Sequence, residues 1–347
     1  MTIFTPSMHQ MTSFQEQNFY ALSHVWGIEP NECMWDVSDF IIDEEGTPVK
    51  PIPMRPEKRK TLLNLLKANP GYWWMDVLCS RSDTPPMIMS GVYGRCKKCF
   101  AMIDCPTEDI EYFSRNKDQL DHVLCDEQLM HEPATQNVIK ETWQRGRSID
   151  ASRWFKRVWT LQEAILPSCV VLFSELSDTY TDESTVLLDS LIHYHLQMKK
   201  WQVDDMLLNM TLFDKDPVRA NVVPGRHLEL LVIFFNKLST SKRSCYFAVD
   251  YVYGILGVLG FDIPRQENAD VAWKHFIAYL DHIVHQTYQG VDMSLHDNSS
   301  IHVSEKARQF SLTEAKNLGQ VFDTLLEVNI DCPCMDCSVI KYRILNA

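Results

Sequence analysis

We expect the chain to contain no segment that would carry it into or across a membrane. No stretch of about 18 or more residues is both apolar and uncharged, which is the length that a membrane-spanning helix needs. The segment Met1 to Gln17 has neither a basic start nor an apolar run, so we expect no secretory signal. The eleven cysteines should then stay reduced, as thiols do inside cells. These absences predict a cytoplasmic protein, with the nucleus as the other compartment left open.

An excess of positive charge is also absent. The 46 Asp and Glu outnumber the 33 Lys and Arg, and the formal net charge of −13 repels phosphate backbones. Two basic clusters, at residues 55–60 and 145–157, match no nucleic-acid motif and are interpreted as solvated helix faces. The run Gly254 to Gly260 has the spacing of neither a dinucleotide fingerprint nor a P-loop. We therefore expect no nucleic-acid partner.

Apolar residues are plentiful, and their pattern predicts an α/β fold. Hydrophobic residues make up 45% of the chain and charged residues 23%, the balance of a globular protein with a core. Helical patterns at 58–68 and from Pro85 to Cys96 alternate with short apolar runs typical of strands. Those runs cover residues 19–26, 72–78, 99–103 and 170–173. This succession predicts a parallel sheet flanked by helices.

The rest of the chain is expected to be mainly helical. An acidic interval at 104–132 is interpreted as a solvated insertion of short helices. Further helices are expected at 135–145, 152–166, 183–200, 226–238, 246–259 and 270–288. We predict a flexible N-terminus at 1–18, an α/β domain at 19–178 and a mainly helical region at 179–347.

The segment Ser152 to Leu166 has an unusual distribution of apolar residues. On a helix they form two adjacent stripes, so such a helix would be largely enclosed. Glu163 falls at the border of that surface, one turn from Trp159. A carboxylate in such a place is either paired or held for chemistry. Both alternatives stay open for Glu163.

Four blocks, in order along the chain, resemble the fungal heterokaryon incompatibility (HET) family. They are Tyr20-Ala-Leu-Ser-His-Val-Trp-Gly27, Trp74-Met-Asp-Val-Leu-Cys79 with Asp83, Arg157-Val-Trp-Thr-Leu-Gln-Glu163 and Asp250-Tyr-Val-Tyr-Gly-Ile-Leu-Gly257. Each block alone is weak, but four in order are specific. The sequence departs from the family at Ser80-Arg81-Ser82, where Ile-Asn-Gln is usual. The side-chain amides of that Asn and Gln are missing here, which puts any activity that needs them in doubt.

The resemblance implies a fold and a site. HET domains are similar to TIR domains, which implies a flavodoxin-like parallel sheet with ligands near the carboxyl ends of its strands. Some TIR domains cleave NAD with a glutamate placed as Glu163 is relative to Trp159, so the implied catalytic residue is Glu163. The implied ligand-binding residues are Ser23, His24, Trp26, Asp76, Trp159 and Gln162.

The chemistry of NAD cleavage suits these residue types. Breaking the nicotinamide–ribose bond passes through an oxocarbenium-like state, which a fixed carboxylate stabilises. An indole such as that of Trp26 or Trp159 can stack on a flat base. The alternative for Gln162 and Glu163 is that they brace neighbouring loops, and for Asp76 that it braces a strand end. NAD would be a substrate here, and no resident cofactor is expected.

The cysteines and histidines suggest two further sites that we do not favour. Cys96 and Cys99 have zinc-like spacing, as do the cysteines at 332–337, but the first pair falls on predicted core positions. A nucleophilic pair of Cys79 and His24 is conceivable. We expect no metal site.

Two functions are consistent with these residues and with the resemblance. The first is an intracellular effector of incompatibility or defence that kills or arrests the cell, in its sharper form by hydrolysing NAD after self-association. The second is a catalytically silent module that signals by association with itself or with other HET or death-signalling proteins.

Overall fold

The computed structural model describes most of the chain in two compact units. The described residues are 18–26, 34–39, 41, 47–80, 84–126, 128–129, 132–200, 227–289, 299–323 and 325–330. Unit 1 comprises residues 1–84, 91–155 and 166–210, and unit 2 comprises 85–90, 156–165 and 211–347. Each unit is described by itself, and the predicted boundary at residue 178 stays a prediction.

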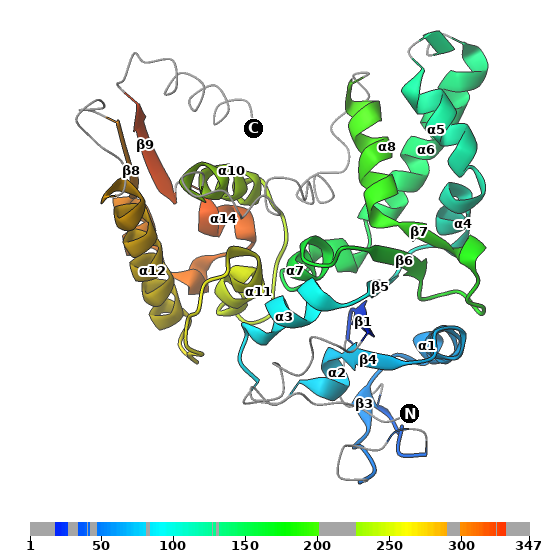
Figure 1. Cartoon of the computed structure of the whole chain (residues 1–347), viewed down its shortest axis with the longest axis horizontal. Helices are drawn as coiled ribbons and strands as arrows, with labels where there is room; N and C mark the ends of the chain where they lie inside the picture. The colour runs from blue at the N-terminus through cyan, green and yellow to red at the C-terminus, as the bar shows by residue number, and fades with distance from the viewer. Residues whose placement is uncertain are drawn as a thin grey trace. The chain divides into compact units, whose positions relative to one another are not determined.

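Unit 1 is built on a five-stranded sheet (Figure 1). The strands, in the order β4-β1-β5-β6-β7, are Tyr72–Met75, Phe19–His24, Lys98–Ile103, Val170–Ser174 and Thr185–Leu187. The first four are parallel and β7 is antiparallel to β6. The parallel strands follow the chain order second, first, third, fourth, as in flavodoxin-like sheets. The predicted α/β class with a parallel sheet is confirmed.

Helix α1, Pro56–Ala68, and the turn after it set the entry to β4. Pro56 suits the first helical position because its missing N–H has no partner there in any case. The helix ends at Asn69, and Gly71 adopts a φ of 144°, which an L side chain rarely tolerates. The chain can therefore reverse directly into Tyr72.

The second predicted strand is shorter than expected. Strand β4 ends at Met75, and helix α2, Asp76–Cys79, follows at once. The Asp76 carboxylate accepts a hydrogen bond from the Val77 amide at 2.7 Å, and its carbonyl accepts one from the Ser80 amide at 2.8 Å. The strand prediction for 76–78 is therefore wrong, because Asp76 starts a helical turn.

Helices α4, Thr107–Arg115, and α5, Lys117–Cys125, fill the acidic interval, and the long helix α6, Pro133–Asp150, follows. The prediction of short helices is confirmed, but the interval is not merely a solvated insertion. Phe113 and Leu120 are buried, and Asp109 forms an ion pair with Arg145 at 2.9 Å. Helix α8 comprises Leu188–Lys200. The helix predicted from 183 is wrong for 185–187, because these residues pair with β6 as β7.

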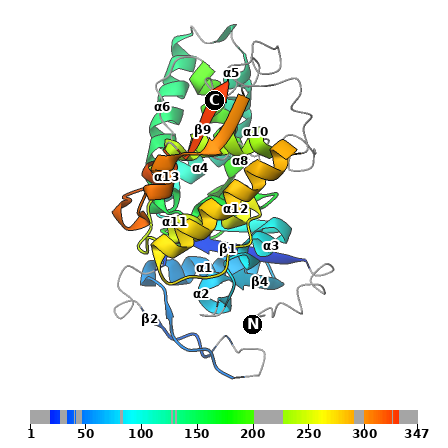
Figure 2. The ribbon, with the colours of Figure 1, turned by 90° about the vertical axis from the view of Figure 1, so that its left-hand side faces the viewer.

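Unit 2 contains helices α10, His227–Ser239, α11, Asp250–Leu259, and α12, Ala269–Gln289 (Figure 2). The short helices α13, Glu305–Gln309, and α14, Leu318–Phe322, follow. An antiparallel hairpin of β8, Ser299–Val303, and β9, Leu326–Ile330, was not predicted. The mainly helical character of this region is confirmed. Within the described part of the chain, no helix is both long and apolar enough to cross a membrane.

The predicted helix from Ser152 to Leu166 is wrong as a single element. The chain forms a 3-10 turn at Arg153–Lys156 and then helix α7, Thr160–Ile165. Between them the Lys156 carbonyl and the Val158 amide bond to Ser244, at 2.8 and 3.1 Å. Those backbone groups therefore have partners outside the helix, which breaks it.

Several features singled out in the sequence lie outside the described residues. These are the N-terminus up to Gln17, the departure at Arg81-Ser82 with Asp83, and the cysteines at 332–337.

Candidate functional site

Each of the four parallel strands of unit 1 has a polar or charged side chain at its carboxyl end. Asp76 follows β4, His24 ends β1, Asp104 follows β5 and Glu175 follows β6. Parallel strands point the same way, so their carboxyl ends share one edge of the sheet. Ligands of open α/β sheets bind at this edge, where the chain turns from one side of the first strand to the other. That reversal occurs here at β1, which lies between β4 and β5.

Trp26, Asp76 and His24 form one group at this edge. The Trp26 indole donates a hydrogen bond to Asp76 Oδ2 at 2.7 Å, and His24 Nε2 lies 3.7 Å from Asp76 Oδ1. His24 Nδ1 lies 3.2 Å from the Val25 carbonyl, while its ring is fully enclosed. Trp26 is 37% exposed. An open aromatic face is thus held in place by a carboxylate.

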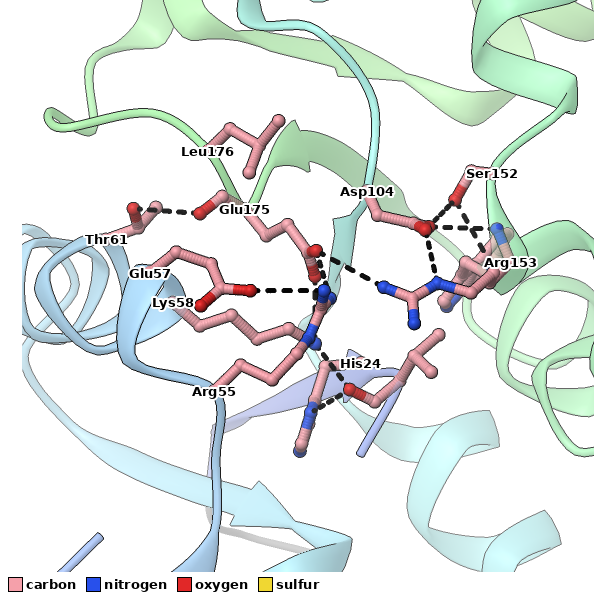
Figure 3. Close-up of polar contacts among 12 residues, drawn as sticks. His24, Arg55, Glu57, Lys58, Thr61, Asp104, Ser152, Arg153, Glu175 and Leu176 are labelled. Atoms are coloured by element: carbon pink, nitrogen blue, oxygen red, sulfur yellow. Dashed lines mark hydrogen bonds and ion pairs between the residues drawn. The ribbon is translucent and has the colours of Figure 1, made fainter. Parts of the chain in front are cut away.

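Glu175 is surrounded by cations (Figure 3). Its Oε2 lies 2.9 Å from Lys58 Nζ, its Oε1 accepts a hydrogen bond from Arg55, and Arg153 Nη2 lies 3.8 Å away. Lys58 is fully buried and also donates to the Val25 carbonyl. Burial lowers the pKa of Lys58 from its ordinary value to about 8, and the charge and hydrogen bond of Glu175 oppose that shift.

Asp104 joins this cluster to the segment after α6. It accepts hydrogen bonds from the Ser152 hydroxyl at 2.5 Å, from the Arg153 amide at 2.9 Å and from Arg153 Nε at 2.5 Å. Burial opposes ionisation of Asp104, but the bonds from Ser152 and Arg153 outweigh it and lower its pKa. Asp104 is therefore ionised at neutral pH.

The charges of this cluster balance. Three cations, Arg55, Lys58 and Arg153, face three carboxylates, since Glu57 lies 3.2 Å from Arg55 in addition to Glu175 and Asp104. Lys58 and Glu175 are enclosed while Glu57 and Arg153 are partly exposed, and the balanced network offers little net charge to a ligand. The cluster therefore holds the carboxyl edge of the sheet in place. The accessible part of that edge is the Trp26–Asp76 pair.

Ser23 has a different role from the other residues predicted at this edge. It is buried, and its hydroxyl accepts a hydrogen bond from the Trp154 indole at 2.6 Å. Cys79, considered above as a nucleophilic partner of His24, is buried and its sulfur accepts a hydrogen bond from the Met75 amide at 3.5 Å. Both therefore contact other parts of unit 1.

The other predicted residues belong to unit 2. Glu163 and Gln162 lie on α7, whose six residues are all buried. Glu163 is 7% exposed and Gln162 is fully buried. Neither amide atom of Gln162 has a hydrogen-bond partner among the residues that the structure describes. Leaving a buried amide without partners costs roughly 1–3 kcal/mol.

Trp159 precedes α7 and contacts α11. Its indole donates a hydrogen bond to Asp250, which opposes the rise in the pKa of that carboxyl caused by burial. The buried Arg243 braces the same region, donating from Nη1 to the Arg157 carbonyl at 2.6 Å and to Thr160 Oγ1 at 2.8 Å. Trp159 thus anchors α7 to α11.

The seven predicted site residues fall into two groups. In unit 1, His24 and Trp26 each contact Asp76, and Ser23 precedes His24 in β1. The group of Trp159, Gln162 and Glu163 belongs to unit 2. That the two groups serve one catalytic site stays a prediction.

Sequence reasoning missed the ionic cluster. The basic residues at 55–60 were interpreted as a solvated helix face, and this is wrong for Lys58, which is fully buried, and for Arg55, which is paired. A signal was present, because Asp104 and Glu175 each come shortly after a predicted strand. Two carboxylates at one sheet edge require cations nearby.

The cysteines fit the interpretation of core residues. Cys96 and Cys99 are buried, and burial raises the pKa of the Cys96 thiol to about 12, which keeps it protonated. Among the described residues, no three His, Cys, Asp or Glu side chains are placed to hold a metal ion.

Comparison with known proteins places this stretch of chain in a family. Residues 19–163 match the model of the family described as heterokaryon incompatibility protein (HET). No significant match is found among curated proteins or among solved structures. The match begins at the first residue of β1 and ends at Glu163, so it includes all seven predicted site residues. The likeness to TIR domains stays a prediction, but residues 19–163 of the chain form a heterokaryon incompatibility (HET) domain.

Proposed function

We propose that this protein is a cytoplasmic effector of heterokaryon incompatibility that cleaves the nicotinamide–ribose bond of NAD. The observation that carries the proposal is the Trp26–Asp76 pair at the carboxyl edge of the sheet, with the indole held at 2.7 Å and 37% exposed. NAD is the substrate in this proposal, and no resident cofactor is required.

The pair suits the two parts of a nucleoside. A flat base stacks on an exposed indole, a contact worth roughly 1–3 kcal/mol. A carboxylate at a strand end accepts hydrogen bonds from ribose hydroxyls, as acidic residues do in dinucleotide-binding folds. Asp76 already accepts from Trp26 through Oδ2 and from the Val77 amide through Oδ1, so its orientation is fixed before a ligand arrives.

The cleavage needs a carboxylate to stabilise the developing positive charge. The bond between ribose C1′ and the nicotinamide nitrogen breaks, and its electron pair leaves with neutral nicotinamide. Water then bonds to C1′ and loses a proton to solvent. Glu163 is the residue that we propose for stabilising the cation, because an enclosed carboxylate acts more strongly than a solvated one.

The test is release of nicotinamide from NAD by the concentrated full chain. We expect Glu163→Gln to reduce the rate about a hundredfold or more. The matched control is Glu141→Gln, which changes a half-exposed surface glutamate and should leave the rate unchanged. Equal rates for the wild type and Glu163→Gln would refute the catalytic role.

A silent interaction module is the second candidate. The observation that favours it is the ionic cluster at the carboxyl edge, where Glu175 is paired with Arg55 and Lys58 and so contacts other parts of the fold instead of a ligand. In that case the protein signals by association with another HET domain. Self-association in sedimentation, with no nicotinamide released at any protein concentration, would support the module and exclude the enzyme.

A further inference from the structure

The backbone carbonyl of Val25 contacts two buried side chains at the carboxyl edge of the sheet (Figure 3). Lys58 donates a hydrogen bond to it from Nζ, and His24 Nδ1 lies 3.2 Å from it. Lys58 is fully buried, and the His24 ring is fully enclosed. Val25 directly precedes Trp26, so these contacts hold the backbone from which the exposed indole projects.

The amine that bonds to Val25 is itself held in place. Lys58 Nζ lies 2.9 Å from Glu175 Oε2, and neither side chain is more than 1% exposed. Lys58 comes from α1 and Glu175 follows β6, so both elements meet the end of β1 at this one amine. An exposed lysine samples many rotamers, whereas an enclosed and paired one keeps few. The Val25 carbonyl therefore has a donor in a fixed position.

Trp26 is held at two points as a result. Its indole donates to Asp76 Oδ2 at 2.7 Å, and its backbone follows the carbonyl to which Lys58 donates. The first contact fixes the ring at its nitrogen, and the second fixes the segment that carries the ring. A stacking surface that is already held in place loses less freedom when a ligand binds. Lys58 should therefore favour binding of a flat base without touching it.

We propose that Lys58 is a positioning residue for Trp26 and acts through the Val25 carbonyl. This inference rests on the proposed function, because Trp26 is the surface that stacks on the base of NAD there. The contacts run from Glu175 through Lys58 and Val25 to Trp26. The ionic cluster thus takes part in ligand binding as well as in holding the fold.

The first test is an NMR experiment that needs no NAD. The indole N–H signal of Trp26 in the isotope-labelled full chain is identified by its absence from Trp26→Phe. We expect Lys58→Met to move this signal and to speed exchange of the indole proton with solvent about tenfold or more. The matched control is Thr61→Val, which removes a buried hydrogen bond from the same helix to the Ser177 carbonyl and should leave the signal in place. An unchanged Trp26 signal in Lys58→Met would overturn the proposal.

The wild type gives a second measurement, which does not depend on whether a variant folds. Burial lowers the pKa of Lys58 to about 8. The charged or titratable groups that face its amine are Glu175, Arg55, Arg153 and, across the Val25 carbonyl, His24. We expect the Trp26 indole signal to shift as pH rises through about 8, because a neutral amine is a weaker donor and loses its ion pair. A signal that stays unchanged, or that shifts alike in Lys58→Met, would overturn the proposal.

The kinetic test depends on the proposed function. Lys58→Met should fold, because Arg55 still pairs with Glu175 when the amine is gone. We expect it to raise the KM for NAD about three- to tenfold while kcat changes less. In a Trp26→Ala background the same substitution should leave KM unchanged, because the residue that Lys58 positions is absent. A rise of KM by the same factor in that background would refute action through Trp26.

Failure of this inference is distinguishable from failure of the proposed function. Nicotinamide release by the wild type, with an unchanged Trp26 signal in Lys58→Met, would refute the positioning role and leave NAD cleavage standing. Absence of nicotinamide release with a moved Trp26 signal would refute NAD cleavage and support the positioning of Trp26 by Lys58.

Discussion

Lys58 and Glu175 form an ion pair of 2.9 Å in which neither side chain is more than 1% exposed. Lys58 comes from helix α1 and Glu175 directly follows strand β6, so the pair joins two segments that lie far apart in the sequence. Removal of either partner should be costly, because the other charge would then stay buried without this counter-ion.

Removal of the carboxylate should be costly. In Glu175→Gln, Lys58 stays buried near Arg55 and Arg153 without its anion, and we expect a loss of about 3–5 kcal/mol in the free energy of unfolding at pH 7. Asp178→Asn is the matched control, since Asp178 pairs with Lys60 at 3.1 Å with both side chains well exposed. That change should cost at most about 1 kcal/mol in urea denaturation. Equal losses would show that the buried cluster does not stabilise the fold.

Lys58 should also make stability depend on pH. Its pKa is about 8 in the folded chain against an ordinary value of 10.5, so between these values the unfolded chain binds more protons. Stability from this residue therefore rises with pH between about 8 and 10.5, by up to about 3 kcal/mol. Buried tyrosines and cysteines, including Tyr251 and Cys96, have raised pKa values and act in the opposite direction.

The difference between the wild type and Lys58→Met isolates this contribution. We expect the wild type to gain stability relative to the variant as pH rises from about 8 to 10.5. A difference that stays constant over that window would show that the pKa of Lys58 is not depressed.

Gly254 should resist substitution in unit 2. A Cβ at this position would overlap Val158 Cγ1 and would lie 3.3 Å from the Val158 carbonyl carbon, inside a helix buried from Tyr251 to Val258. We expect Gly254→Ala to destabilise the fold by about 1–3 kcal/mol in thermal denaturation.

The same substitution at a second helical glycine should stabilise the fold instead. Gly94 lies in α3, Ile88–Arg95, and nothing lies within 4 Å of a Cβ placed there. Gly94→Ala should stabilise by up to about 1 kcal/mol, because alanine favours a helix. Adding Val158→Ala to Gly254→Ala should recover part of the loss, and no recovery would place the clash elsewhere.

Trp26 should contribute to the binding of NAD. Trp26→Ala removes the stacking surface, and we expect the KM for NAD to rise about tenfold or more while kcat changes less. Tyr72→Ala is the control, because Tyr72 is 50% exposed at the amino end of β4, away from the carboxyl edge. Equal effects of the two substitutions on KM would contradict the proposed role.

The sequence predicted the sheet better than the segments that surround it. Buried apolar runs such as that of β5 have few alternatives to a central strand, so their positions were clear. The helix over Ser152–Leu166 was wrong because its periodicity was helical while its backbone groups found a partner at Ser244, far away in the chain. Strand β7 was missed because three residues carry too little pattern to stand out.

The candidate site was predicted in part for a related reason. Trp26 ends one predicted strand and Asp76 lies near the end of another, so both were expected at the carboxyl edge that parallel strands share. Lys58 could not be recognised, since a lysine in a helix with other cations is usually exposed. Its burial depends on Glu175, which lies 117 positions later, and no local pattern records such a pair.

The order of the sheet strands has a consequence for synthesis of the protein. The strand made first, β1, takes an interior position, and its two neighbours arrive only with residues 72–75 and 98–103. A nascent chain that ends before Lys98 therefore leaves one side of β1 without its partner. A ribosome must therefore deliver β5 before this sheet can close.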